Sequence, residues 1–99
     1  MIEQAMKKHW SEWYDWDKDD IYDTIYAVVP SNNWNTVDIE LVLKDGRVDK
    51  AYMCPYEEYT EDGGDYWKTY ELSDMHYRTY RTGDNIEKWR YLNDWESEY

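Results

Sequence analysis

The sequence predicts a single α+β domain over residues 1–99, with an N-terminal helix, an antiparallel sheet of four or five strands and a C-terminal helix. Three observations predict this fold class. The length suits one domain. Apolar residues recur at helical spacing near both ends of the chain. In the middle they alternate with polar residues on either side of an Asp-Gly pair. We therefore expect one sheet layer packed against one helical layer.

Aromatic residues can supply most of the core of such a domain. The chain contains 7 Trp and 12 Tyr but no Phe. Each of these side chains can bury on the order of 150–250 Å², and a domain of this size buries roughly 60–70% of its unfolded surface. A core without a metal or a disulfide is therefore feasible. Because Tyr and Trp keep a polar group, they also suit half-buried positions and binding surfaces.

The first segment is typical of an amphipathic helix. At a period of 3.6 residues, one side of this helix is formed by Ile2, Met6, Trp13 and Trp16. His9 lies on the same side, and we expect it to pack at the edge of the core rather than to bind a ligand. Aspartates between positions 15 and 20 then interrupt the helix.

Residues 21–29 are open to two interpretations. Their β-branched and aromatic side chains favour a strand, which is the interpretation that we prefer. The i,i+4 pair Ile21 and Ile25 permits a helix instead, and Asp20 could cap it. Residues 30–33, Pro-Ser-Asn-Asn, form a loop in either case.

The clearest local signal is a β-hairpin around Asp45 and Gly46. Its first strand alternates polar residues with Val37, Ile39, Leu41 and Leu43. Asp-Gly flanked by alternating residues predicts a two-residue turn. In that register Leu43 faces Val48, Ile39 faces Tyr52 and Val37 faces Cys54, all on the core side, while Leu41 faces Lys50.

The second half of the chain predicts a connector, two strands and a helix. Residues 55–65 form an acidic connector, and residues 66–72 and 76–82 are two strands rich in Tyr, Trp and Thr. Asp84 and Glu87 match the spacing of a capping box at the start of the last helix. The apolar side of that helix is formed by Ile86, Trp89, Leu92 and Trp95.

The charge of the chain limits its partners. There are 23 acidic residues against 11 basic ones, which gives a formal net charge of −12. Phosphates repel such a chain, so we expect no direct binding to nucleic acid or to an anionic membrane. A basic protein is the favoured partner. The alternative is that the charge only keeps an aromatic-rich surface in solution.

The cellular location that we expect is the cytoplasm. Cys54 is the only cysteine, which fits a reducing compartment, and we expect it to be a buried structural thiol. The first eight residues contain no apolar run long enough for a signal peptide. No stretch approaches the roughly 20 apolar residues of a membrane span.

The sequence contains few of the residue patterns that catalysis requires. We therefore predict that the chain is not an enzyme and needs no cofactor. There are two histidines, and no nucleophile signature or phosphate-binding Gly-rich loop. A carboxylate pair of the glycosidase type needs only a cleft, but a chain this short leaves little room for one. The run that starts at Asp15 resembles a calcium-binding loop, yet Asp20 stands at the required Gly and Tyr26 at the required Glu. We therefore expect no metal site.

Two acidic clusters are the candidate partner-binding residues. The first comprises Asp15, Asp17, Asp19, Asp20 and Asp23, and the second Glu57, Glu58, Glu61, Asp62 and Asp65. Alternate residues of a strand lie about 6.6 Å apart, and i,i+4 residues of a helix about 5–6 Å apart. Either spacing can set carboxylates in rows like the phosphates of a nucleic acid. Trp16 and Tyr59 are the expected aromatic anchors beside them. The alternative is that the aromatics are core and the acids a solvated surface.

With its acidic runs at residues 15–23 and 57–65, its short length and its aromatic richness, the chain resembles small phage-encoded inhibitors of bacterial defence, namely anti-CRISPR proteins and DNA-mimic anti-restriction proteins. The resemblance is one of composition and includes no motif. It implies occlusion of the nucleic-acid-binding site of a host CRISPR effector or restriction nuclease. Two other functions stay open: an immunity protein or antitoxin against a nuclease toxin, and a module that binds sugars or small ligands on exposed rings.

Overall fold

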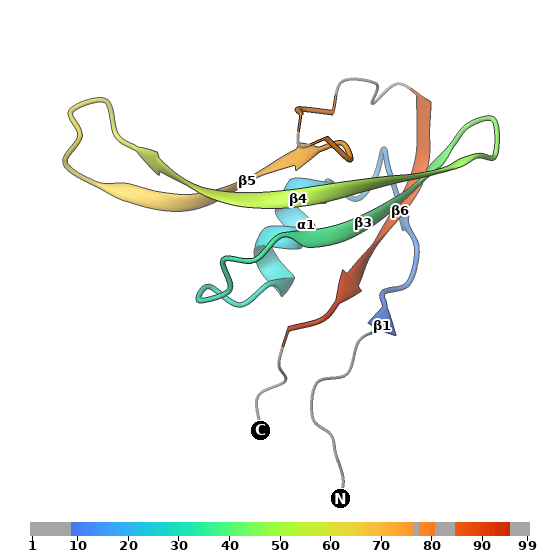
Figure 1. The fold of residues 1–99 in the computed structure, drawn as a ribbon, viewed down its shortest axis with the longest axis horizontal. Coiled ribbons are helices and arrows are strands. Elements are labelled where there is room, and N and C mark those ends of the chain that lie inside the picture. The colour runs from blue at the N-terminus through green and yellow to red at the C-terminus, as the bar shows by residue number, and fades with distance from the viewer. Residues whose placement is uncertain (1–8, 77, 81–84, 96–99) are drawn as a thin grey trace, which may run out of the picture.

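The computed structural model describes residues 9–76, 78–80 and 85–95 as an antiparallel sheet with one helix (Figure 1). The elements are β1 (His9–Trp10), β2 (Tyr14–Asp15), α1 (Ile21–Val28), β3 (Val37–Leu43), β4 (Val48–Tyr59), β5 (Tyr66–Ser73) and β6 (Ile86–Asn93). The strand order is β1-β6-β3-β4-β5, and β2 also pairs with β6. The antiparallel sheet therefore has six strands rather than the predicted four or five, and in the described residues the segments predicted as N- and C-terminal helices are strands.

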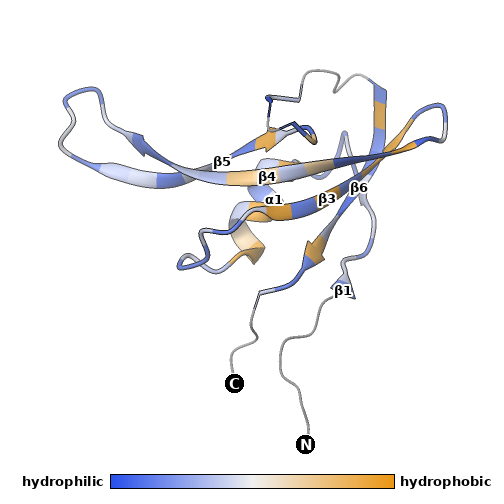
Figure 2. Ribbon diagram, in the orientation of Figure 1, coloured by the Kyte–Doolittle hydropathy of each residue, from blue (hydrophilic) through white to orange (hydrophobic). Residues whose placement is uncertain are grey.

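The hydrophobic core lies between the sheet and α1, which Figure 1 shows behind β3 and β4. Figure 2 shows the hydrophobic residues concentrated in α1 and in the central parts of the strands. We call the face under α1 the core face, and the opposite face the open face, because no described helix covers it. The burial pattern of β3 alternates accordingly between buried and half-buried residues. None of the described helical structure is long and apolar enough to cross a membrane.

Residues 21–28 form a helix, so the preferred strand interpretation of this segment was wrong. Ile21 and Ile25 are buried on its inner side. The Asp20 carboxylate caps it by accepting hydrogen bonds from the backbone N–H groups of Tyr22 (2.8 Å) and Asp23 (3.1 Å). A proline disfavours helical geometry in the residue before it, and the helix accordingly ends at Val28, with Val29 extended before Pro30. The cap and the i,i+4 pair outweigh the β-propensity of the segment.

The β3–β4 hairpin is confirmed, but its register differs from the predicted one by one residue. Val42 pairs with Val48, and the Leu43 N–H donates to the Arg47 carbonyl at 2.8 Å, so the turn contains the three residues 44–46 rather than two. Gly46 has a φ of 93°, and its N–H donates to the Leu43 carbonyl at 2.8 Å. Gly46 is the left-handed residue that ends a three-residue hairpin turn, and this turn is one residue longer than the predicted two-residue turn.

This shift moves alternate β4 side chains to the other face, because a strand has a period of two. Ala51 and Met53 are buried opposite Ile39 and Val37. Tyr52 and Cys54, predicted on the core face, lie on the open face instead and are half-buried.

The predicted C-terminal helix is wrong, because Ile86–Asn93 is a strand. A β-bulge explains the helical spacing of its apolar residues. Val42 pairs with Lys88 and Leu43 with Ile86, so Glu87 is an extra residue on β6. Ile86 and Trp89 therefore share the core face although they lie three residues apart. Asp84, the first residue of the predicted capping box, is outside the described residues.

The predicted N-terminal helix is also wrong over its described part. His9–Trp10 and Tyr14–Asp15 are short strands that pair with β6, and the start of the predicted helix lies outside the described residues. The Tyr14 ring stacks on Trp89 with centroids 4.8 Å apart. Pairing with the edge of β6 and this stacking replace the helical hydrogen bonds, so tertiary contacts decide the conformation of the segment.

Two further predictions in the second half need correction. β4 continues to Tyr59, so the predicted connector shrinks to residues 60–65. The predicted strand over residues 76–82 is reduced, in its described part, to an isolated bridge between Ser73 and Thr79. There the Asp74 carboxylate instead accepts hydrogen bonds from two backbone N–H groups, those of His76 (2.8 Å) and Arg78 (3.0 Å).

Lys68 of β5 anchors the loop between α1 and β3. Its ammonium donates hydrogen bonds to the carbonyls of Pro30 (3.3 Å), Ser31 (3.4 Å) and Asn33. It also lies 5.1 Å from the Trp34 ring centroid and 5.2 Å from that of Tyr70. Partial burial lowers the pKa of Lys68, whereas the carbonyl contacts favour the charged ammonium.

Replacing Lys68 with methionine is expected to lower the free energy of unfolding by about 1.5–3 kcal/mol, the usual range for hydrogen bonds to a charged group. Methionine keeps the apolar part of the side chain and removes the charge. Urea unfolding measures the loss. Lys44→Met in the exposed β3–β4 turn is the matched control, with an expected change within about 0.5 kcal/mol. Equal stability of the two variants would contradict the anchoring role.

Candidate partner-binding surface

β4 and β5 extend beyond the rest of the sheet as a two-stranded ribbon. β3 pairs with β4 only as far as Met53, whereas β4 and β5 stay paired as far as Tyr59 and Tyr66. Figure 1 shows this hairpin, in yellow, projecting from the sheet. We call residues 56–69 the acidic arm. Of the described elements, only β4 and β5 form it. At its base Lys68 bonds to the loop between α1 and β3, whereas residues 57–59 and 61–67 are exposed.

The exposed charge of the arm is entirely negative. Its acidic side chains are those of the second cluster, Glu57, Glu58, Glu61, Asp62 and Asp65, and all five residues are exposed. No Lys or Arg occurs between Lys50 and Lys68. The ammonium of Lys68 is engaged with the loop carbonyls described above. The arm is therefore a projecting strand pair with uncompensated negative charge.

Each face of the arm combines carboxylates with aromatic rings, because successive strand residues point to opposite faces. One face carries Glu57, Tyr59 and Tyr66, and the other carries Tyr56, Glu58 and Trp67. On the first face the Tyr59 hydroxyl donates to Glu57 Oε1 at 2.7 Å, and this hydrogen bond raises the pKa of Tyr59. The Tyr59 and Tyr66 ring centroids lie 5.6 Å apart.

The second face also combines a carboxylate with two rings. Glu58 pairs with Trp67 across the strands, and Trp67 is 45% exposed. Partial burial, followed by the charge of Glu58 and a hydrogen bond to it, raises the pKa of Tyr56. Both faces therefore carry a tyrosine and a glutamate two residues apart on β4, with a further ring on the neighbouring strand.

The tip of the arm is a compact turn organised by Asp62. Its Oδ1 accepts hydrogen bonds from the Thr60 hydroxyl (2.6 Å) and the Gly64 N–H (2.9 Å), which hold the pKa of Asp62 below its usual value. Gly63 has a φ of 73°, in the left-handed region that favours glycine. Asp62 therefore shapes the turn, while Glu61 and Asp65 stand exposed beside it.

In the first cluster, the aspartates that organise the backbone differ from those that project. Asp15 Oδ1 accepts from the N–H groups of Asp17 (2.8 Å) and Lys18 (3.0 Å), and Asp19 Oδ2 accepts from that of Asp15 (3.1 Å). Asp20 caps α1. The two remaining members, Asp17 and Asp23, are exposed. Trp16, one of the expected anchors, is half-buried against the core. Three of the five carboxylates in this cluster therefore stabilise the local backbone.

The structure does not bring the two clusters together. Asp15 pairs with Lys88 of β6, and the Asp19 carbonyl accepts a hydrogen bond from Trp89 Nε1 at 3.2 Å, so the first cluster is attached to β6. The second cluster lies on the hairpin of β4 and β5, and β3 separates β4 from β6. Figure 1 shows the segment before α1 near the middle of the molecule and the arm at one side.

The open face carries a cation and aromatic cluster that the sequence did not reveal. The Arg90 guanidinium lies 4.8 Å from the Trp10 ring centroid and 4.4 Å from that of Trp13. Arg90 also forms an ion pair of 2.7 Å with Glu40, and Lys88 lies over Trp13 at 5.1 Å. These residues meet only because distant strands pair, so no local pattern could have indicated the cluster. It attaches β1 to the sheet.

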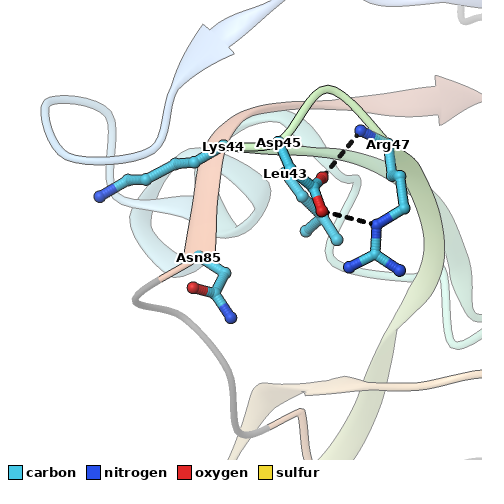
Figure 3. A pocket seen from close by; sticks show the side chains of 5 residues that line it. All are labelled: Leu43, Lys44, Asp45, Arg47 and Asn85. Atoms are coloured by element: carbon cyan, nitrogen blue, oxygen red, sulfur yellow. Dashed lines mark hydrogen bonds and ion pairs between the residues drawn. The ribbon is translucent and has the colours of Figure 1, made fainter.

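A cavity of about 350 Å³ lies beside the β3–β4 turn (Figure 3). It is lined by Leu43, Lys44, Asp45, Arg47 and Asn85. Figure 3 shows the Asp45 carboxylate accepting hydrogen bonds from the backbone and side chain of Arg47, at 3.0 and 2.8 Å. These bonds, the backbone one first, lower the pKa of Asp45. Asp45 and Arg47 therefore compensate each other's charge. In the described part of the chain, no three His, Cys, Asp or Glu side chains are placed to hold a metal ion.

The protein is therefore an antiparallel sheet with one face covered by α1 and an acidic arm that projects from it. A scan against protein-family models found no match. Searches of curated proteins and of solved structures found none either.

Proposed function

We propose that this chain is an inhibitor that places its acidic arm in the nucleic-acid-binding site of a basic host nuclease. The observation that carries the proposal is the arm itself, a ribbon with five exposed acidic residues and no exposed cation between Lys50 and Lys68. A groove lined with Lys and Arg attracts such an element through the same interactions that bind phosphate. The activity requires no catalytic residue, metal or cofactor.

The dimensions of the ribbon support mimicry of a nucleic-acid strand. A β-strand rises about 3.3 Å per residue, and each strand of DNA carries one phosphate for about every 3.4 Å of helix axis. Glu57 and Glu58 are consecutive and point to opposite faces, so each face of the arm carries one of these two carboxylates. The exposed Tyr59 lies one residue further and can provide apolar contact area.

The partner class follows from this charge. We propose a CRISPR effector or restriction nuclease in the cytoplasm, which is the host cytoplasm if a phage encodes the chain. An immunity protein or antitoxin would use the same arm against a basic nuclease toxin. The identity of the bound nuclease separates these two cases: a defence enzyme supports the first, and a toxin supports the second.

Ionic strength tests the proposal. Purified chain is immobilised, bacterial lysate is passed over it at about 50 and 300 mM salt, and captured proteins are identified. We expect a nucleic-acid-binding protein whose affinity falls about 100-fold over this range, because salt screens the charges and both surfaces release counterions. Capture that is independent of salt, or a partner that does not bind nucleic acid, would overturn the proposal.

A further inference from the structure

The two faces of the acidic arm carry matching groups, and this suggests which partner side chains they take. Each face carries a glutamate, a tyrosine two residues from it on β4, and a second ring on the neighbouring strand; on one face the Tyr59 hydroxyl donates to Glu57 Oε1. Tyr59 is 57% exposed, Tyr66 61% and Trp67 45%, so these rings are not part of the core. The bond from Tyr59 occupies Glu57 Oε1 and leaves Oε2 for a partner.

Elsewhere in the chain, rings of this kind hold cations. Lys68 lies over Trp34 and Tyr70, Lys88 lies over Trp13, and Arg90 lies between Trp10 and Trp13. Arg90 combines two rings with the carboxylate of Glu40. The arm offers the same two components, a ring and a carboxylate, and none of the described cations is recorded over its rings.

We infer that each face of the arm binds an arginine side chain of the partner, so that the arm occupies a cleft with arginines on both walls. This inference rests on the proposed function. Arginine fits better than lysine because its planar guanidinium stacks on a ring and presents parallel N–H donors to a carboxylate, whereas an ammonium is a compact, strongly hydrated charge. A second copy of this chain is disfavoured as the occupant, since two equally acidic arms repel each other.

Hexa-arginine and hexa-lysine peptides test the inference on the purified chain. Calorimetry measures their affinities at one ionic strength, and NMR spectra locate the perturbed residues. We expect hexa-arginine to bind about tenfold more tightly than hexa-lysine. It should perturb Tyr59 and Tyr66 on one face and Trp67 on the other. Equal affinities would overturn the preference for arginine, and perturbation of a single face would overturn the two-walled cleft.

Ring removal provides the second test. Tyr59→Thr/Tyr66→Thr empties one face and Trp67→Thr the other, and threonine keeps a high strand propensity. Each variant is expected to weaken hexa-arginine binding about three- to fivefold and hexa-lysine binding by a smaller factor. Val48→Thr at the other end of β4, 58% exposed, is the control with no expected effect. NMR spectra verify that the arm stays paired. If these variants bind hexa-arginine like the control, the rings are not the arginine sites.

The outcomes separate this inference from the proposed function. Equal, salt-sensitive binding of both peptides would leave the inhibitor proposal standing and reject the arginine sites. A clear arginine preference combined with salt-independent capture from lysate would reject the inhibitor proposal and keep the sites.

Discussion

Replacing Trp89 with alanine is expected to cost about 3–5 kcal/mol of folding free energy, the usual range for removing a large buried ring. Trp89 is fully buried and lies at the centre of an aromatic stack with Tyr14 and Tyr91. Its Nε1–H donates to the Asp19 carbonyl at 3.2 Å, so it also fixes the segment before α1. Domains of this size are stable by about 5–15 kcal/mol, so the substitution is expected to remove a large fraction of the free energy of unfolding.

Urea unfolding and NMR spectra measure this effect. Trp67→Ala on the arm is the matched control, because it removes the same ring from a position that is 45% exposed. We expect the control to lose at most about 1 kcal/mol. Comparable losses in both variants would contradict the placement of Trp89 in the core and of Trp67 on the surface.

Reversing three charges on the arm is expected to lower the affinity for the partner at least about 100-fold, since like charges placed together cost several kcal/mol. The variant is Glu58→Lys/Glu61→Lys/Asp65→Lys. It spares Asp62, whose carboxylate holds the turn together. The fold is expected to persist, because reversal relieves repulsion among exposed groups.

A variant of equal charge change provides the control. Glu12→Lys/Asp17→Lys/Asp23→Lys raises the net charge by the same amount at exposed residues away from the arm. It spares the aspartates that bind the backbone, so folding is not confounded with binding. We expect this variant to bind its partner with an affinity near that of the unmodified chain. Loss of binding here, with retention in the arm variant, would place recognition at residues 12–23 instead.

Local signals in the sequence predicted local structure. Asp45 and Gly46 located the first hairpin, because the turn needs a left-handed residue there. Whether that turn had two residues or three decided the register, and the sequence did not distinguish them. Asp20 and the Ile21/Ile25 pair indicated a helix, but the β-propensity of the same residues was given more weight.

The terminal segments were mispredicted because their conformations depend on residues far away in the sequence. β6 pairs with β3 and with the segment that contains β1 and β2. Its bulge places Ile86 and Trp89 on one face, which imitates the spacing of a helix. No window of the sequence contains both partners of such a pairing, so periodicity alone could not identify the strand.

The candidate site was predictable in composition but not in arrangement. The sequence located both acidic clusters and named Tyr59, which is exposed on the arm. It could not separate the aspartates that cap backbone groups, such as Asp20, from those that project. It also could not show that Trp16 is half-buried while Trp67 is exposed, since burial depends on the assembled sheet.

Displacement of nucleic acid from the captured partner tests the central claim most directly. The partner is bound to labelled nucleic acid, and the chain or its Glu58→Lys/Glu61→Lys/Asp65→Lys variant is added in increasing amounts. If the arm occupies the nucleic-acid site, the unmodified chain releases the label competitively and the variant does not. A ternary complex in which the partner holds the chain and the nucleic acid together would contradict the account.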